Sequence, residues 1–300
     1  IIQSFIIERN DNMNGILIVN KPQDFTSRDV VNKVGGIKKK KKIGHTGTLD
    51  PIATGVLVIC IGNTTKLCEV LTSEYKEYIA TIKLGIKTDT LDTTGKIIER
   101  KDFNITEPQI IEVLSSFLGK STQVTPIYSA VKVNGKKLYE YAREGIKVEL
   151  PTREINITNI ELISFNNDEI VFKTTVSKGT YIRALIDDIC KKLNTVGTMS
   201  SLIRTKQGNF KIEESYTIED IEKGITSKEC ALDLYYHCMW DSDFSYNGKS
   251  YWDLTRAEHN STEFKAFCEE MKQDKVAQLA NELKEYDIIS IVEYEDHSDV

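Results

Sequence analysis

Long hydrophobic runs are missing from this 300-residue sequence, and none approaches the roughly 18–20 apolar residues that a membrane-spanning helix needs. The first segment, IIQSFIIERNDN, also lacks the basic stretch and the small-residue cleavage site of a signal peptide. Hydrophobic residues make up 40% and charged residues 28% of the chain, as in ordinary globular proteins. We therefore expect a cytoplasmic protein with no membrane partner, built as one large domain or two smaller ones.

Closely spaced cysteines are missing as well. The six cysteines are scattered, whereas disulfide frameworks belong mostly to small secreted domains and structural zinc sites use four ligands in paired spacings. Cys230, His237 and Cys238 come nearest to a ligand set, but their spacing is not that of a zinc site. We expect no metal ion and no disulfide framework.

An overall excess of positive charge is also missing, because the formal net charge is −6. The acidity is concentrated at the end of the chain, where residues 241–300 hold 15 acidic and 6 basic side chains. The preceding residues hold 33 basic and 30 acidic side chains and are therefore mildly positive. Since a local basic face is enough to hold phosphates, the charge does not exclude an RNA partner.

The pattern of apolar and turn residues mixes strands with isolated helices. Short β-branched or alternating segments predict strands at Ile16–Asn20, Gly55–Ile61 and Glu77–Leu84. Turn residues between apolar runs predict hairpins at Asn134-Gly135 and Asn166–Asp168. Cap residues and helical spacing predict helices at Thr106–Leu118, Leu138–Arg143 and Ile182–Leu193. Strand pairs joined by hairpins favour an α+β fold, with a mainly antiparallel mixed sheet and flanking helices.

The densest group of special residues is GHTGTLDPIATG at positions 44–55. Three glycines and a proline predict a tightly turned loop, and the buried strand that follows gives this loop a rigid base. Such a loop can present the carboxylate of Asp50 with little freedom. An isolated Asp-Pro pair is usually an ordinary turn, so Asp50 alone does not indicate catalysis.

The loop resembles the catalytic motif of the TruB family of tRNA pseudouridine-55 synthases, whose aspartate stands in a G-H-T-G-x-L-D-P setting. Four further blocks agree in the family's order: NGILIVNKPQDFTS near the start, LGIKTDTLDTTG at 84–95, PIYSAVKVNGKKLYEYAREG at 126–145 and SKGTYIRALIDDI at 177–189. The resemblance covers roughly residues 13–225. It implies the pseudouridine synthase fold and isomerisation of a uridine in the T loop of tRNA.

The resemblance also implies roles for individual residues. Asp50 matches the catalytic aspartate, Tyr78 the tyrosine that packs against the target base, and Arg183 the partner of the catalytic carboxylate. His45 matches the histidine that fills the helical stack around the extruded nucleotide. The remaining substrate-binding candidates are the pocket residues Tyr181 and Leu202, together with Asp92 and Lys21, which lie in family blocks. For Asp92 the resemblance fixes no single role, and we interpret Lys21 as positioning rather than chemistry.

The chemistry of pseudouridine formation explains these residue types. The reaction breaks the C1′–N1 bond and rejoins the base through C5, with no redox step and no added group, so we expect no cofactor. A carboxylate can attack C6 or C1′, or draw a proton to give a glycal, and the sequence leaves these routes open. Arg183 favours the charged form of Asp50. Extruding the uridine costs a few kcal/mol of unstacking, of which stacking on Tyr78 recovers about 1–3 kcal/mol.

A run of five lysines directly precedes the catalytic loop: Lys38, Lys39, Lys40, Lys41 and Lys42. Such a run is usually a solvated surface segment. Its place beside the loop leads us to the hypothesis that it contacts RNA phosphates.

These patterns predict that the chain is divided into three parts. Residues 13–234 form the expected catalytic domain, and residues 235–300 an acidic, mostly helical tail of unknown role. Many family members carry a small PUA-type β-barrel at their C-terminus, and residues 235–300 do not resemble one. Residues 1–12 precede Met13, which is either the natural start after an extension or a residue of an ordinary N-terminus.

Other functions also fit parts of the sequence. An RNA chaperone would bind tRNA without needing Asp50, whereas a glycosidase would need a second carboxylate, for which Asp92 is the candidate. A guide-directed rRNA synthase is a further alternative, which the missing PUA-like segment disfavours. We expect a monomer that acts on the T stem-loop of tRNA.

Overall fold

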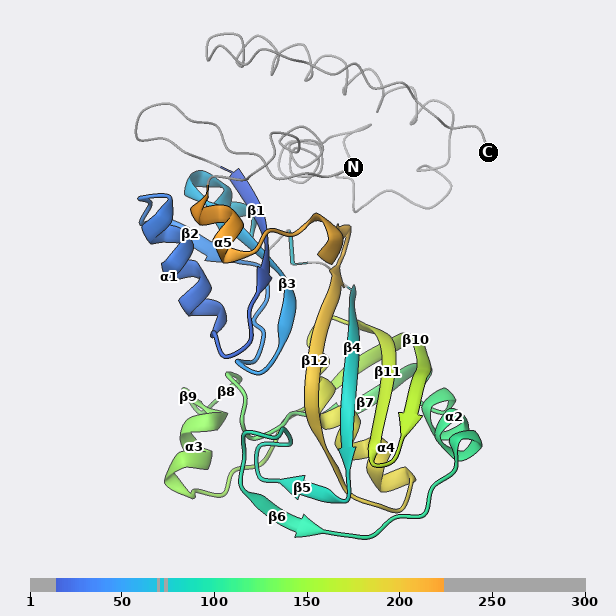
Figure 1. Ribbon diagram of the computed structural model, residues 1–300. Helices are drawn as coiled ribbons and strands as arrows, with labels where there is room; N and C mark the ends of the chain where they lie inside the picture. The colour runs from blue at the N-terminus through green and yellow to red at the C-terminus, as the bar shows by residue number, and fades with distance from the viewer. Residues whose placement is uncertain (1–14, 69–70, 73–74, 224–300) are drawn as a thin grey trace, which may run out of the picture. The chain divides into compact units, whose positions relative to one another are not determined.

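A computed structural model describes residues 15–68, 71–72 and 75–223, which belong to one compact unit (Figure 1). The predicted extension at 1–12, the whole of the predicted tail at 235–300 and the boundary at 234 lie outside the described residues, as do Cys230, His237 and Cys238. The domain division therefore stays a prediction.

A nine-stranded sheet organises the described part of the chain. Its strands are β1 (Gly15–Lys21), β2 (Ile43–His45), β3 (Thr54–Ile61), β4 (Tyr75–Leu84), β7 (Gly119–Val124), β10 (Thr152–Asn166), β11 (Glu169–Ser177), β12 (Gly197–Gln207) and β13 (Phe210–Lys211). The main order is β1-β3-β12-β4-β11-β10-β7, with β2 on β3 and β13 on β12. Among these described pairings only β3 with β12 is parallel, so the mainly antiparallel mixed sheet is confirmed.

Two small hairpins and short helices complete the described fold. The hairpins are β5 (Ile86–Thr88) with β6 (Ile97–Arg100), and β8 (Lys132–Val133) with β9 (Lys136–Lys137). The helices are α1 (Ser27–Ile37), α2 (Glu107–Ser115), α3 (Leu138–Glu144), α4 (Ile182–Lys192) and α5 (Ile218–Glu222), with 3-10 turns η1 (Gly62–Leu67) and η2 (Ile212–Glu214). Within the described ranges, no helix has the length and apolar character that crossing a membrane requires.

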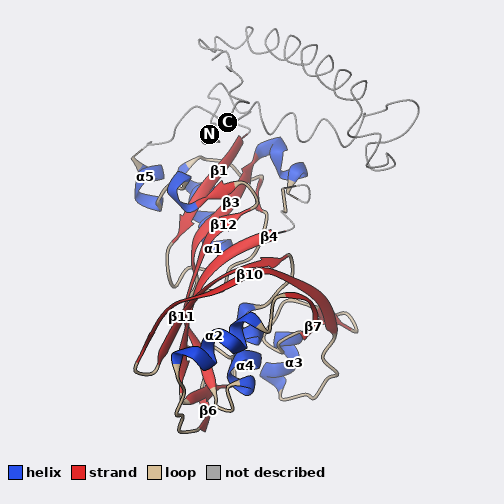
Figure 2. Ribbon diagram, turned by 90° about the vertical axis from the view of Figure 1, so that its right-hand side faces the viewer, coloured by secondary structure: helices blue, strands red, loops and turns tan. Residues whose placement is uncertain are grey.

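The main core lies where α2 and α4 pack on one face of the curved half of the sheet formed by β4, β11, β10 and β7 (Figure 2). Helix α4 buries the stripe that its sequence predicts, with Leu185, Ile186 and Ile189 at most 1% exposed. Because this stripe fixes the helix on the sheet, it also fixes the first turn of α4, which carries Arg183.

Most of the predicted elements are confirmed. The hairpin turn at Asn134-Gly135 has φ angles of +50° and +81°, the left-handed conformation that the Asn-Gly pair favours. Helix α2 has the predicted capping box, but the predicted end at Leu118 was wrong. The helix ends at Ser115 because Phe117 and Leu118 donate to carbonyls three residues back, in tight turns that lead into β7.

We expect Gly55→Ala to lower the free energy of unfolding by about 3 kcal/mol, because left-handed strain and overpacking each cost about 1–3 kcal/mol. Gly55 has φ +98°, and a Cβ atom there would lie 2.3 Å from the backbone oxygen of Arg204. Urea denaturation measures the change. Gly36→Ala in α1 is the matched control, since a Cβ atom there meets no heavy atom within 4 Å. Equal stability of the two variants would contradict this account of Gly55.

Candidate active site

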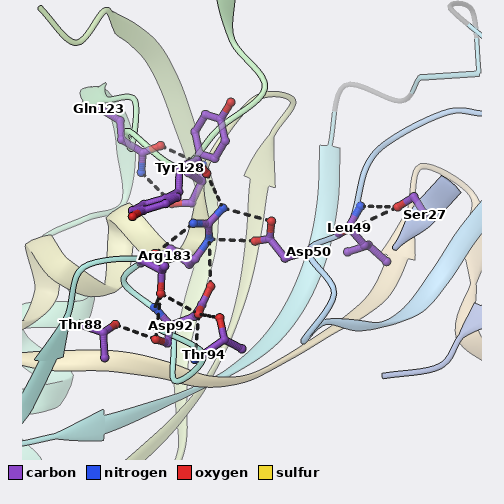
Figure 3. Close-up of polar contacts among 11 residues, drawn as sticks. Ser27, Leu49, Asp50, Thr88, Asp92, Thr94, Gln123, Tyr128 and Arg183 are labelled. Carbon is purple, nitrogen blue, oxygen red and sulfur yellow. Dashed lines mark hydrogen bonds and ion pairs between the residues drawn. The ribbon is translucent and has the colours of Figure 1, made fainter. Parts of the chain in front are cut away.

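The loop between β2 and β3 carries Asp50 and is fixed by its main chain. Its first residue, Thr46, donates from its backbone nitrogen to the Val58 oxygen at 3.1 Å. At its middle, the backbone nitrogen of Leu49 donates to the buried hydroxyl of Ser27 at 2.8 Å (Figure 3). These two bonds hold the backbone at Thr46 and at Leu49, the residue directly before Asp50.

Lys21 also supports this loop, because its side chain donates to the carbonyl oxygen of Pro51. It is fully buried, and its ammonium group donates to the carbonyl oxygens of Pro22 at 2.8 Å, Phe25 at 2.5 Å and Pro51 at 3.2 Å. Burial lowers the pKa of Lys21 to about 8, opposed by the charges of Asp24 and Asp50. Its contacts therefore support the positioning role expected for it, while direct substrate binding stays an untested prediction.

Arg204 on β12 bridges the two ends of the loop. Its fully buried guanidinium donates to the oxygen of Gly47, before Asp50, at 3.1 Å and to that of Val56, after Asp50, at 2.7 Å. The Arg204 side chain thus fixes the distance between the chain segments before and after Asp50.

Asp50 and Arg183 form a two-point ion pair. Nε of Arg183 lies 2.8 Å from Oδ2 of Asp50, and Nη2 lies 3.1 Å from Oδ1. The Arg183 side chain is 7% exposed and that of Asp50 34%, so the carboxylate reaches the surface while its partner is enclosed. The fork geometry sets the orientation of the carboxylate plane.

Arg183 is itself held by three further groups. It donates to the carbonyl oxygens of Thr90 at 3.0 Å and Tyr128 at 3.1 Å, and a carboxylate oxygen of Asp92 lies 3.9 Å from its Nε (Figure 3). The guanidinium therefore cannot turn without breaking several bonds.

Asp92 lies behind the arginine and is 6% exposed. Its Oδ1 accepts from the hydroxyl groups of Thr90 at 2.9 Å and Thr94 at 2.5 Å, and from the backbone nitrogen of Thr94 at 3.0 Å. These bonds leave its other oxygen for Arg183. The structure thus places Asp92 as a second anion beside the guanidinium and gives it no exposed path to a substrate.

Tyr78 and Leu202 lie on neighbouring strands and share one face of the sheet. Tyr78 on β4 is paired with Arg204 on β12, and Leu202 is two residues earlier on β12, so both side chains project toward the catalytic loop. They are 7% and 5% exposed and belong to the same apolar cluster as Leu49. The residue before Asp50 therefore packs with the two predicted pocket residues.

Tyr181 is the residue before α4 and is fixed by a side chain from β7. The amide of Gln123 accepts from the backbone nitrogen of Tyr181 at 2.9 Å and donates to its oxygen at 3.1 Å. The guanidinium of Arg153 lies 5.4 Å from the centre of the Tyr181 ring. The ring is thereby held two residues from Arg183.

His45 ends β2 and is half-buried just before the loop. Burial lowers the pKa of its imidazole, and the charges of Arg204 and Arg28 lower it further, so the ring is neutral near pH 7. A neutral ring can enter a base stack without adding a charge.

The lysine run follows α1 and reaches the loop through β2. Lys39, Lys41 and Lys42 are exposed, and Lys42 donates to the Asn63 side chain at 3.1 Å. The side-chain contact described for the exposed lysines is on Asn63 rather than on the Asp50 carboxylate, so the predicted role of the run concerns the surface beside the site. In the described part of the chain, no group of three or more His, Cys, Asp or Glu residues could hold a metal ion.

Sequence reasoning missed Ser27, Gln123 and the role of Arg204. Arg204 stands two residues after Leu202, a spacing that places both side chains on one face of a strand. That spacing was a usable signal. Ser27 and Gln123 act on main-chain groups distant in sequence, for which the sequence holds no signal.

The site thus consists of the Asp50 carboxylate on a rigid loop, paired with the enclosed Arg183. An apolar wall that includes Tyr78 and Leu202 lies beside it. Such a carboxylate can act as a nucleophile or accept a proton from a group that enters the site.

The fold is that of the pseudouridine synthases. Among solved structures, a chain in the "Crystal Structure of a Cbf5-Nop10-Gar1 Complex" is similar with a TM-score of 0.56 and 28% identity, over 80% of this chain and 61% of that one. This chain therefore spans less than two thirds of the length of that relative. A chain in the "Structure of H/ACA RNP bound to a substrate RNA containing 2'-deoxyuridine" has a TM-score of 0.53 and 25% identity, over 83% and 67%.

The chain belongs to the TruB family of pseudouridylate synthases. Residues 36–182 match the model of the TruB family pseudouridylate synthase N-terminal domain. The tRNA pseudouridine synthase B of Clostridium tetani is 47% identical over 239 residues, which cover 78% of this chain and 83% of the relative. That of Bacillus subtilis is 48% identical over 217 residues, covering 70% of each chain. The family predicted from the sequence motifs is confirmed.

Proposed function

We propose that this chain converts a uridine in the T loop of tRNA to pseudouridine, with Asp50 as the catalytic carboxylate. The observation that carries the proposal is the two-point pairing of Asp50 with Arg183 on the anchored GHTGTLDP loop. The similar proteins named tRNA pseudouridine synthase B support the same reaction.

The geometry suggests how the reaction would proceed. The target uridine leaves its stack and enters the site, where Tyr78 and Leu202 offer an apolar wall for the base and His45 can fill the vacancy. An oxygen of Asp50 then attacks C6 or C1′, or accepts a proton that leads to a glycal, and the C1′–N1 bond breaks. The base turns and C5 bonds to C1′. The Asp50 oxygen leaves C6 or C1′, or returns its proton to the ribose of the glycal, and the C5 proton is lost while N1 gains one.

Arg183 would hold the Asp50 carboxylate in its orientation as the base arrives. Because three contacts besides those to Asp50 already fix the guanidinium, it needs no rearrangement when the base arrives. The net reaction exchanges protons and moves one bond, so the residues of this chain suffice and no cofactor enters the proposal.

The partner in this proposal is the T stem-loop of tRNA, bound by a monomer in the cytoplasm. Folded loops with unstacked bases are the RNA elements that proteins read most readily, which supports a loop uridine over a duplex one. Binding without chemistry would identify the chaperone alternative.

Release of tritium from tRNA labelled at C5 of uridine tests the proposal, because only rejoining through C5 loses that label. We expect one equivalent of label per tRNA, with pseudouridine at the T-loop position, and no release when that uridine is replaced by cytidine. Free uracil would identify a glycosidase. Tight binding without release would replace the proposal with the chaperone.

The lysine run gives a separate prediction for RNA affinity. We expect replacing Lys39, Lys41 and Lys42 with glutamine to weaken tRNA binding and to reduce the slope of log K against log salt by about 2 units, since each phosphate contact contributes about 0.7–0.9. Filter binding between low and moderate salt measures the slope. Glutamine at the exposed Lys96 and Lys101, near the β5–β6 hairpin, is the control. An unchanged slope in the first variant would remove the run from the RNA interface.

A further inference from the structure

Helix α4 presents two opposite charges on one face. Arg183 stands in its first turn, and Asp187 follows four residues later, which places the two side chains on the same side of the helix. They are 7% and 14% exposed, so both charges lie largely out of solvent. Arg183 holds Asp50, whereas Asp187 has no contact with the catalytic loop among the described interactions.

The β5–β6 hairpin presents two charges that are complementary to this face. Lys87 on β5 donates to Oδ1 of Asp187 at 2.5 Å, and Asp92 in the hairpin loop lies 3.9 Å from Nε of Arg183. The hairpin and the helix therefore meet at two points with opposite polarity. Sliding the hairpin along α4 would bring like charges closer together, so this arrangement selects one position.

Thr88 connects the two contact points within the hairpin. Its buried hydroxyl donates to the backbone oxygen of Asp92 at 2.6 Å and lies 2.9 Å from the hydroxyl of Thr198 on β12. Lys87 is thus one residue from a group that is bonded directly to Asp92. A shift of Lys87 would be passed to the Asp92 backbone and to the Thr90 carbonyl that binds Arg183.

We infer that Lys87 and Asp187 form a positioning pair that fixes the Asp92 loop against Arg183 and so aims the Asp50 carboxylate. Neither residue touches the site of reaction, and both act through Arg183. The inference rests on the proposed function, because its consequence is a rate of pseudouridine formation.

Lys87→Met is the variant that isolates this role. When Lys87 is removed, Asp187 keeps its second partner, since Lys191 Nζ lies 2.7 Å from its other oxygen. Burial would raise the pKa of Asp187, but hydrogen bonds from Lys191 and Lys87 outweigh it and lower the pKa. The carboxylate therefore stays paired in the variant, and methionine retains the length of the lysine stem.

The experiment measures single-turnover pseudouridine formation at saturating tRNA, the Kd for tRNA and thermal unfolding, for the full chain. We expect Lys87→Met to lower the rate about tenfold or more, because small misplacements of reacting groups are costly. The Kd of Lys87→Met for tRNA should change by less than about twofold, since the pair acts on chemistry rather than binding. Lys87→Arg keeps the positive charge and should keep most of the rate. Lys83→Met is the control, as it breaks a more exposed ion pair of similar length with Asp168 outside the site.

Asp187→Asn completes a double-mutant cycle. If the two residues act as one unit, the double variant should be no slower than Lys87→Met by more than about twofold. A wild-type rate in Lys87→Met, a rate loss matched by a loss of tRNA affinity, or fully multiplicative single effects would each overturn the inference. An inactive wild-type chain would instead reject the proposed function, so the two failures are distinguishable.

Discussion

Asp50→Asn is expected to reduce tritium release from C5-labelled tRNA by about 10⁴-fold or more, the size of effect seen when a group that forms bonds in the reaction is removed. Asparagine has nearly the same shape and can still accept a bond from Arg183, so the fold and tRNA affinity should be retained. What is lost is the negative charge that attacks or draws a proton. Single-turnover assays with saturating tRNA separate this loss from weaker binding.

The matched control is Asp24→Asn. Asp24 is also attached to the catalytic loop, because its backbone nitrogen donates to the Pro51 oxygen at 2.8 Å, and its positive φ of +65° is one that asparagine tolerates. It should keep the rate within about threefold, as surface changes usually do. Equal release by Asp50→Asn and wild type would mean that Asp50 does not carry the chemistry and would overturn its assignment as the catalytic carboxylate.

Arg183→Met should have the second largest effect and should act on both activity and stability. Removing one partner of an enclosed ion pair costs about 3–5 kcal/mol, and the exposed side of Asp50 places this case near the lower value. The change leaves Asp50 and Asp92 without their shared cation and the carbonyls of Thr90 and Tyr128 without a donor. The rate should fall by about 10³-fold, as for loss of a preorganised electrostatic group.

Urea denaturation and single-turnover assays check the two parts of this prediction. Arg183→Lys keeps the charge but has no planar fork, so it should recover part of the stability and little of the rate. Arg100→Met, at an exposed position on β6, should change stability by no more than about 0.5 kcal/mol. If Arg183→Lys were as active as wild type, charge alone would matter and the fork geometry would be irrelevant.

Much of the fold could be predicted because its local signals are strong. The alternation of Glu77–Leu84, the Asn-Gly turn and the capping box of α2 each specify one conformation over a few residues. The pattern did not predict β12, whose sequence GTMSSLIRTKQ lacks clear alternation. That strand pairs with β3 and β4 from far along the chain, so its conformation depends on tertiary contacts rather than local preference.

The site could be predicted only in part, for a related reason. The motif identified Asp50 and Arg183 as partners, and the structure places them in contact although 133 residues separate them. Their supports at Thr90 and Tyr128 are main-chain oxygens, which every residue possesses and no sequence distinguishes. The same holds for Gln123, whose amide binds the Tyr181 backbone across 58 positions.

The parallel pairing of β12 with β3 has a consequence for how the protein becomes active during synthesis. The loop that carries Asp50 is made early, whereas its guanidinium partner at Arg183 and the bridge at Arg204 are made much later. A ribosome that has delivered only the first half of the described chain has therefore produced the carboxylate without the groups that aim it. Because such distant contacts form late in folding, a partly folded chain should have no modifying activity. Incomplete copies should therefore be unable to alter RNA, and activity would itself report that β12 has paired with β3.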